Sequence, residues 1–115
     1  MNQDLIPWLV MGGVVAAMLI FKRLGQVSSA DARRMVQEGA KLVDVRSPAE
    51  FGSGHIPGAV NVPVNELGAK LKAIGPKDKP VIVYCASGTR SAMARSMLKS
   101  QGFEKVFNLG AMSRW

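Results

Sequence analysis

The sequence is poor in several residue types that define whole classes of protein. Its 115 residues include one cysteine, one histidine and one tyrosine, and aromatic residues make up only 6%. One cysteine excludes an intrachain disulfide framework and fits a reducing compartment. The shortage of aromatics argues against binding of single-stranded nucleic acid, which relies on bases stacking on aromatic rings. Repeats and low-complexity tracts are also missing, and the length leaves room for one domain of modest size.

Acidic residues are scarce as well. There are 8 Asp and Glu against 15 Lys and Arg, which gives a formal net charge of +7. The basic residues are scattered along the chain, so nucleic acid is not predicted as a partner. We expect the excess positive charge to lie beside an anionic membrane face and to attract small anionic substrates.

Charge is absent from a run near the start of the chain, from Leu5 to Phe21, which ends abruptly at Lys22 and Arg23. As a helix this run reaches about 25 Å at 1.5 Å per residue. That length falls within the range of membrane-spanning helices once the flanking basic side chains extend to the interface. Trp8 suits an interfacial anchor. The sequence therefore predicts one transmembrane helix in an N-terminal anchor, residues 1–25.

Two other interpretations of this run are weaker. A cleaved signal peptide begins with basic residues, whereas the segment Met1–Asp4 is acidic, and the run is longer than a usual signal-peptide core. A buried core helix that is apolar on all sides would be unusual in so small a domain. Because Lys22 and Arg23 follow the run, the positive-inside rule predicts a single-pass protein of the inner (cytoplasmic) membrane with its catalytic domain in the cytoplasm.

Strand patterns alternate with helix patterns in the remainder, residues 26–115. Short apolar, β-branched segments predict strands at 41–45, 59–62, 81–84 and 106–109. Helices are expected near 28–38, 47–51, 65–74 and 91–101. This alternation predicts an α/β fold: a small parallel sheet with helices on both faces.

The lone cysteine, Cys85, lies where a predicted strand ends and a predicted helix begins. The helix would place Met93, Met97 and Leu98 on one face. A loop in this position aims backbone N–H groups and the positive end of a helix dipole at the sulfur. Such surroundings bring a cysteine pKa from about 8.5 into the range of roughly 3.5–7.5. The alternative is a buried structural cysteine, but ligands of open α/β sheets bind at the carboxyl ends of strands, which favours a reactive thiol.

Three motifs, in order along the chain, resemble the rhodanese family. They are Asp44-Val45-Arg46, then Phe51 with His55-Ile56-Pro57-Gly58-Ala59, and then the loop Cys85–Ser91. The resemblance covers residues 26 to 115. With the apolar run in front, the chain resembles bacterial membrane-anchored single-domain rhodaneses.

The resemblance implies a sulfurtransferase that works without a metal or another cofactor. The Cys85 thiolate would attack the outer sulfur of a small anionic donor such as thiosulfate and expel sulfite, and a thiol or cyanide would accept the sulfur from the Cys85 persulfide. Asp44, Arg46 and His55 would be scaffold, and Arg90 would either attract the donor or brace the loop. The persulfide and the donor would be bound by the loop residues Ala86, Ser87, Gly88, Thr89, Arg90 and Ser91.

The donor and the alternatives stay open at this point. Many thiosulfate-using members have a basic residue directly after the cysteine, where this chain has Ala86, and Ala86-Ser87-Gly88 looks more like the mercaptopyruvate branch. A related-fold phosphatase or arsenate reductase would separate its cysteine and arginine by five residues, whereas four lie between Cys85 and Arg90. A membrane-tethered persulfide carrier or docking module for a protein partner would use the same thiol.

Overall fold

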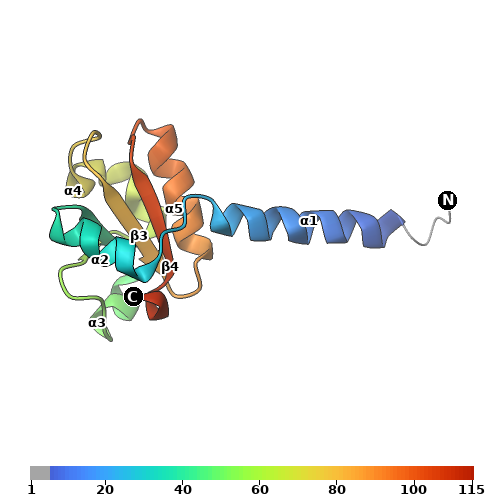
Figure 1. Ribbon diagram of the computed structural model, residues 1–115, viewed down its shortest axis with the longest axis horizontal. Coiled ribbons are helices and arrows are strands. Elements are labelled where there is room, and N and C mark those ends of the chain that lie inside the picture. The colour runs from blue at the N-terminus through green and yellow to red at the C-terminus, as the bar shows by residue number, and fades with distance from the viewer. Residues whose placement is uncertain (1–5) are drawn as a thin grey trace.

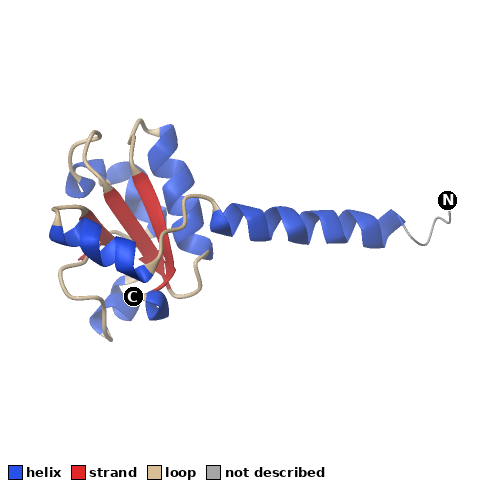
Figure 2. Ribbon diagram, viewed as in Figure 1, coloured by secondary structure: helices blue, strands red, loops and turns tan. Residues whose placement is uncertain are grey.

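A parallel β-sheet organises the chain (Figure 2). Within residues 6–115, which this computed structural model describes, the sheet has four strands in the order β2-β1-β3-β4. Every neighbouring pair is parallel. The strands are β1 (Lys41–Asp44), β2 (Val60–Asn61), β3 (Val81–Cys85) and β4 (Val106–Ala111). The predicted α/β fold with a small parallel sheet is confirmed.

Helices cover both faces of the sheet, as predicted (Figure 2). Side chains alternate along β3, whose five residues are all buried, and this alternation separates two cores. Val81, Val83 and Cys85 belong to the core that includes Leu98 of α5 (Thr89–Ser100). Ile82 and Tyr84 belong to the opposite core, with Ala32 of α2 (Ser29–Gln37). The sulfur therefore lies on the face of the sheet that α5 covers.

The short helix α3 (Pro48–Gly52) begins with the predicted capping box. The Ser47 hydroxyl accepts a hydrogen bond from the Glu50 amide at 3.2 Å, and the Glu50 carboxylate accepts one from the Ser47 amide at 3.1 Å. Pro48 fits the first helical position because its missing N–H has no partner there. This cap fixes the direction of the chain immediately after β1.

The expected helix at 65–74 is divided into two pieces. A 3₁₀-helix, η2 (Val64–Ala69), is followed by the single turn α4 (Leu71–Ile74), and the two are separated at Lys70, whose φ of −122° is not helical. Gly68 weakens this segment as a helix, since glycine loses the most backbone entropy on ordering. Leu67 of η2 and Ile74 of α4 are both buried.

The predicted apolar face of α5 is partly wrong. Leu98 is buried, but the side chains of Met93 and Met97 remain exposed. Ala94 instead packs with Leu98 in the core on this side of the sheet, and Ser91 and Ala92 are also buried. The buried face of α5 therefore includes Leu98 but not the two methionines.

Helix α1 (Ile6–Arg23) projects away from the sheet and its covering helices (Figure 1). Its large apolar side chains are exposed along its length: Trp8, Leu9, Val10, Met11, Val14, Val15, Met18, Leu19 and Ile20. The segment after α1 then runs along β4, where Val27 donates to the Asn108 carbonyl at 3.0 Å and Asn108 donates to the Gly25 carbonyl at 2.9 Å. These bonds attach the end of α1 to the sheet.

The predicted transmembrane helix is not supported. Across residues 6–115, the structure contains no helix with both the length and the apolar character needed to cross a membrane. The described part of α1 carries Lys22 and Arg23 in its last turn, and its uncharged portion is shorter than the hydrocarbon core of about 30 Å. Leu5, where the predicted span begins, and Asp4 lie outside the described residues.

Candidate active site

Cys85 is the last residue of β3, and the loop after it folds back over the sulfur. The residue is fully buried. The Gly88 amide donates a hydrogen bond to Sγ at 2.9 Å, and the Ser91 amide lies 3.4 Å from the same atom. Gly88 has a φ of +97°, which glycine adopts without steric cost. That conformation lets the loop enter α5 directly.

The hydrogen bonds around Sγ decide the ionisation of the thiol. Burial has the largest single effect, and it raises the pKa of the Cys85 thiol. The Ser91 hydroxyl and the amides of Ser91, Gly88 and Ser87 act in the opposite direction, and together they lower the pKa below its ordinary value. The structure therefore has the surroundings that the sequence led us to expect for a thiolate: donors aimed at the sulfur at the start of a helix.

The Ser91 hydroxyl has two partners. Its oxygen lies 3.4 Å from Sγ, and it donates to the Gly88 carbonyl at 3.1 Å. With the thiol protonated, the S–H group is the donor to Oγ. On ionisation the hydroxyl must rotate so that it donates to the sulfur instead, because a thiolate only accepts hydrogen bonds.

A Ser91→Ala protein should therefore hold a less acidic thiol. Removing a donor to the charged form raises the pKa of Cys85, so at neutral pH a smaller fraction is thiolate. We expect the rate of thiol alkylation by iodoacetamide at neutral pH to fall roughly tenfold, as befits loss of a hydrogen bond to a charged group. The whole pH profile should move toward higher pH. An unchanged profile would contradict this role, and Ser96→Ala on the exposed side of α5 is the matched control.

Arg90 is held by an acid that the sequence analysis did not assign to the site. Its guanidinium donates two hydrogen bonds to Glu50, at 2.7 and 3.0 Å. The Arg90 guanidinium and the Ser47 amide lower the pKa of Glu50 to about 2, so the carboxylate is charged at physiological pH. Of the two predicted roles of Arg90, the geometry matches bracing: the residue ties the loop after Cys85 to the capped start of α3.

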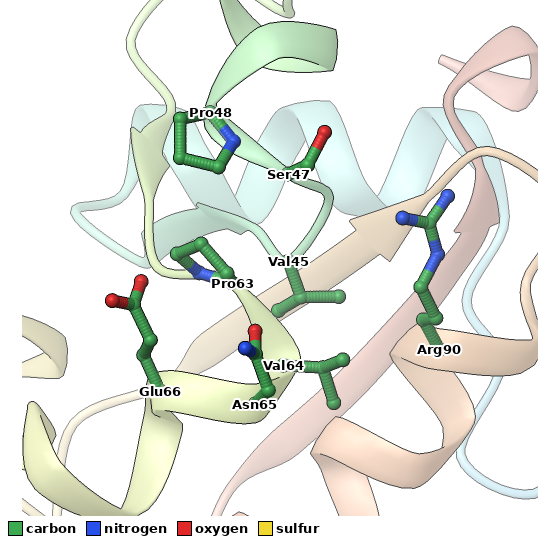
Figure 3. Close-up of a pocket in the computed structure, with 8 residues that line it drawn as sticks. All are labelled: Val45, Ser47, Pro48, Pro63, Val64, Asn65, Glu66 and Arg90. Carbon is green, nitrogen blue, oxygen red and sulfur yellow. The ribbon is translucent and has the colours of Figure 1, made fainter.

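A pocket of about 350 Å³ lies on the Arg90 side of the loop (Figure 3). Arg90 stands on one side, facing Pro48 and Pro63 across the opening, with Val45 and Val64 between them (Figure 3). Asn65 and Glu66 of η2 complete the far wall. We refer to this as the Arg90 pocket.

Asp44 and Arg46, expected to be scaffold, form a buried network at the carboxyl end of β1. Arg46 donates to both carboxylate oxygens of Asp44, at 2.7 and 3.0 Å, and to the Gly54 carbonyl at 2.7 Å. The Tyr84 hydroxyl accepts a hydrogen bond from the Ile56 amide at 3.1 Å, and burial raises the pKa of Tyr84 to about 12. These contacts attach the glycine-rich segment around 54–58 to the carboxyl ends of β1 and β3.

The predicted site residues thus differ in their positions around the sulfur. Gly88 and Ser91 donate hydrogen bonds to Sγ, and the Ser87 amide also lowers the pKa of the thiol. The exposed Ala86 and Thr89 form the outer side of the loop. His55 is exposed and stacks on Phe51, with the ring centroids 3.7 Å apart. Glu50 was missed because only its capping role is visible locally; nothing in the sequence near position 50 indicates a partner at position 90.

Comparison with known proteins agrees with this arrangement. The family model of the Rhodanese-like domain matches residues 28–115. A sulfurtransferase of Allochromatium vinosum is 42% identical over 79 residues, which cover 68% of this chain and 73% of that protein. Thiosulfate sulfurtransferase GlpE of Pseudomonas syringae is 34% identical over 96 residues, covering 83% of this chain and 87% of that protein.

Solved structures give the same result. The human single-domain sulfurtransferase TSTD1 superimposes with a TM-score of 0.72 at 30% sequence identity, over 79% of this chain and 94% of that one. The family model and the fold comparison therefore agree. The chain belongs to the rhodanese-like proteins.

Proposed function

We propose that this protein is a sulfurtransferase that carries sulfur on Cys85. The observation that supports it most is the set of donors around Sγ: the amides of Gly88 and Ser91 and the Ser91 hydroxyl. Donors in this arrangement stabilise negative charge on the reacting sulfur both before and after it takes up a second sulfur atom. The sulfurtransferases among its relatives support the same assignment.

The reaction proceeds in two halves. The Cys85 thiolate attacks the outer sulfur of thiosulfate; the new Sγ–S bond forms as the S–S bond of the donor breaks, and sulfite leaves with the electron pair. An acceptor thiolate or cyanide then attacks the outer sulfur of the persulfide, and the electrons of the Sγ–S bond return to Cys85 as a thiolate. No general base is needed, because the attacking thiol is already acidified.

The width of the loop supports sulfur over phosphoryl chemistry. The Gly88 and Ser91 amides approach Sγ to 2.9 and 3.4 Å, and Arg90 is paired with Glu50 instead of pointing free into the loop. A tetrahedral phosphate would need donors spread around three oxygens and a free cation. In this structure the two amides converge closely on Sγ, and Glu50 compensates the charge of Arg90.

The donor is proposed to be a small anion, attracted by the amides and by the start of α5. Ala86 provides no charge, and Glu50 compensates that of Arg90, so the loop itself places no free cation beside the donor. We further propose the cytoplasm as the compartment, since a lone reactive thiol stays reduced there and thiol acceptors are abundant.

Intact-protein mass spectrometry tests the proposal directly. After incubation with thiosulfate, the protein should gain the mass of one sulfur atom, and a thiol should remove it again. Parallel incubation with mercaptopyruvate identifies the preferred donor. A protein that gains no sulfur from either donor, although its thiol reacts with iodoacetamide, would contradict the assignment.

A further inference from the structure

A second pocket, of about 390 Å³, lies against the other part of the catalytic loop. We call it the Lys22 pocket. It is formed where the last turn of α1 meets the loop and the carboxyl end of β4. Its lining residues are Leu19, Lys22, Arg23, Gln26, Ser87, Gly88, Gly110, Ala111 and Arg114.

The Lys22 pocket is strongly basic. Lys22, Arg23 and Arg114 line it, and no carboxylate does among the residues that the structure describes. The ion pairs found within residues 6–115 involve other cations: Arg34, Arg46, Lys70 and Arg90. Positive charges gathered without a counter-ion repel one another, so a bound anion would relieve an unfavourable arrangement.

Arg114 is fixed in place although it is exposed. Its guanidinium donates to the Leu109 carbonyl at 2.7 Å and to the Val27 carbonyl at 3.3 Å. These bonds use neutral acceptors, so they orient the group without compensating its charge. A pre-oriented cation loses less conformational entropy on binding an anion than a free side chain does.

The Lys22 pocket also touches the loop that holds the reactive sulfur. A Cβ placed on Gly88 would lie 3.6 Å from Cε of Lys22, so the lysine side chain passes directly over Gly88. The amide of Gly88 is in turn 2.9 Å from Sγ. A molecule in this pocket therefore lies against the loop whose Gly88 amide contacts the sulfur.

From this geometry we propose that the Lys22 pocket binds the carboxylate groups of a small acidic thiol, which accepts sulfur from the Cys85 persulfide. This inference rests on the proposed sulfurtransferase function and specifies its acceptor. The pocket volume is typical of sites for small organic ligands and exceeds what thiosulfate needs. The carboxylates would lie among the three cations while the thiol reaches past Ser87 and Gly88 to the outer sulfur.

The test compares two acceptors that differ in charge. Wild-type protein, loaded with thiosulfate and freed of excess donor, is mixed with mercaptosuccinate, which has two carboxylates, or with 2-mercaptoethanol, which has none. Loss of the persulfide is followed by mass spectrometry. In a Lys22→Gln/Arg23→Gln protein, the ratio of the second-order rate constants, mercaptosuccinate over mercaptoethanol, should fall roughly three- to tenfold, since each partly exposed charge contributes modestly.

A matched control separates the pocket from general charge effects. Lys77→Gln/Lys79→Gln changes the net charge equally at two exposed residues before β3, at the opposite end of the sheet, and should keep the wild-type ratio. An unchanged ratio in the Lys22→Gln/Arg23→Gln protein, or an equal fall in the control, would overturn the inference.

A second readout does not depend on sulfur transfer. Succinate, which has no thiol, should shift the amide NMR signals of Ser87 and Gly88 in the wild-type protein, and these shifts should weaken in the Lys22→Gln/Arg23→Gln protein. Absence of any succinate-dependent shift would overturn the acceptor site. Failure to form a persulfide would overturn only the underlying function, so the two failures are distinguishable.

Discussion

A Cys85→Ser protein is expected to lose sulfur transfer by several orders of magnitude while it keeps its fold. Serine is close to cysteine in size and can accept the same amide hydrogen bonds, so β3 and the loop should remain in place. Its hydroxyl, however, is hardly ionised at neutral pH and is a weak nucleophile. Steady-state transfer from thiosulfate to cyanide measures the activity, and circular dichroism with thermal unfolding measures the fold.

The single thiol removes ambiguity about which residue carries the sulfur. Because Cys85 is the one cysteine of the chain, any sulfur gained in the wild-type protein and missing in the variant must have been on that residue. Substantial turnover by a folded Cys85→Ser protein would contradict the covalent mechanism. It would then direct attention to a non-covalent route through the loop amides.

The largest effect on stability is expected for Asp44→Ala. The Asp44 carboxylate is fully buried and accepts hydrogen bonds from the Arg46 side chain and from the Arg46 amide at 2.9 Å. Its removal leaves the buried Arg46 guanidinium without a counter-charge. Breaking a buried pair in this way costs about 3–5 kcal/mol, which is a large part of the stability of a small domain. Urea unfolding measures the free-energy difference.

An exposed ion pair provides the control for that measurement. Lys70 and Glu66 approach to 3.5 Å with both side chains about half exposed, so Glu66→Ala should cost at most about 1 kcal/mol. Equal losses in the two proteins would mean that burial of the Asp44–Arg46 pair does not determine its contribution.

Most of the sheet and the loop could be predicted from the sequence because their signals are local. The run Val81–Tyr84 is apolar and β-branched, and its end at Cys85 is marked by the small residues that follow. The capping box of Ser47 and Glu50 is likewise contained within four residues. Where a structure is determined by neighbours in the chain, periodicity and turn chemistry are sufficient.

Other features depend on contacts between distant residues. Glu50 and Arg90 are 40 positions apart, and Lys22 reaches Gly88 only because α1 ends beside β4. The two faces of α5 also depend on what packs against them: the sequence favours Met93 and Met97, but the core takes Ala94 and Leu98 instead. Such pairings are set by tertiary packing, which local patterns do not contain.

The segment that follows α1 has a further consequence for the edges of the sheet. One edge strand of the sheet, β2, has only two residues, too few to template pairing with another chain. The other edge strand, β4, is longer. There the Val27 amide and the Gly25 carbonyl form hydrogen bonds with the backbone carbonyl and amide of Asn108, which would otherwise be unpaired. The turn between helix and domain therefore also shields an aggregation-prone edge, so a fragment cut just after it would expose β4 for strand addition.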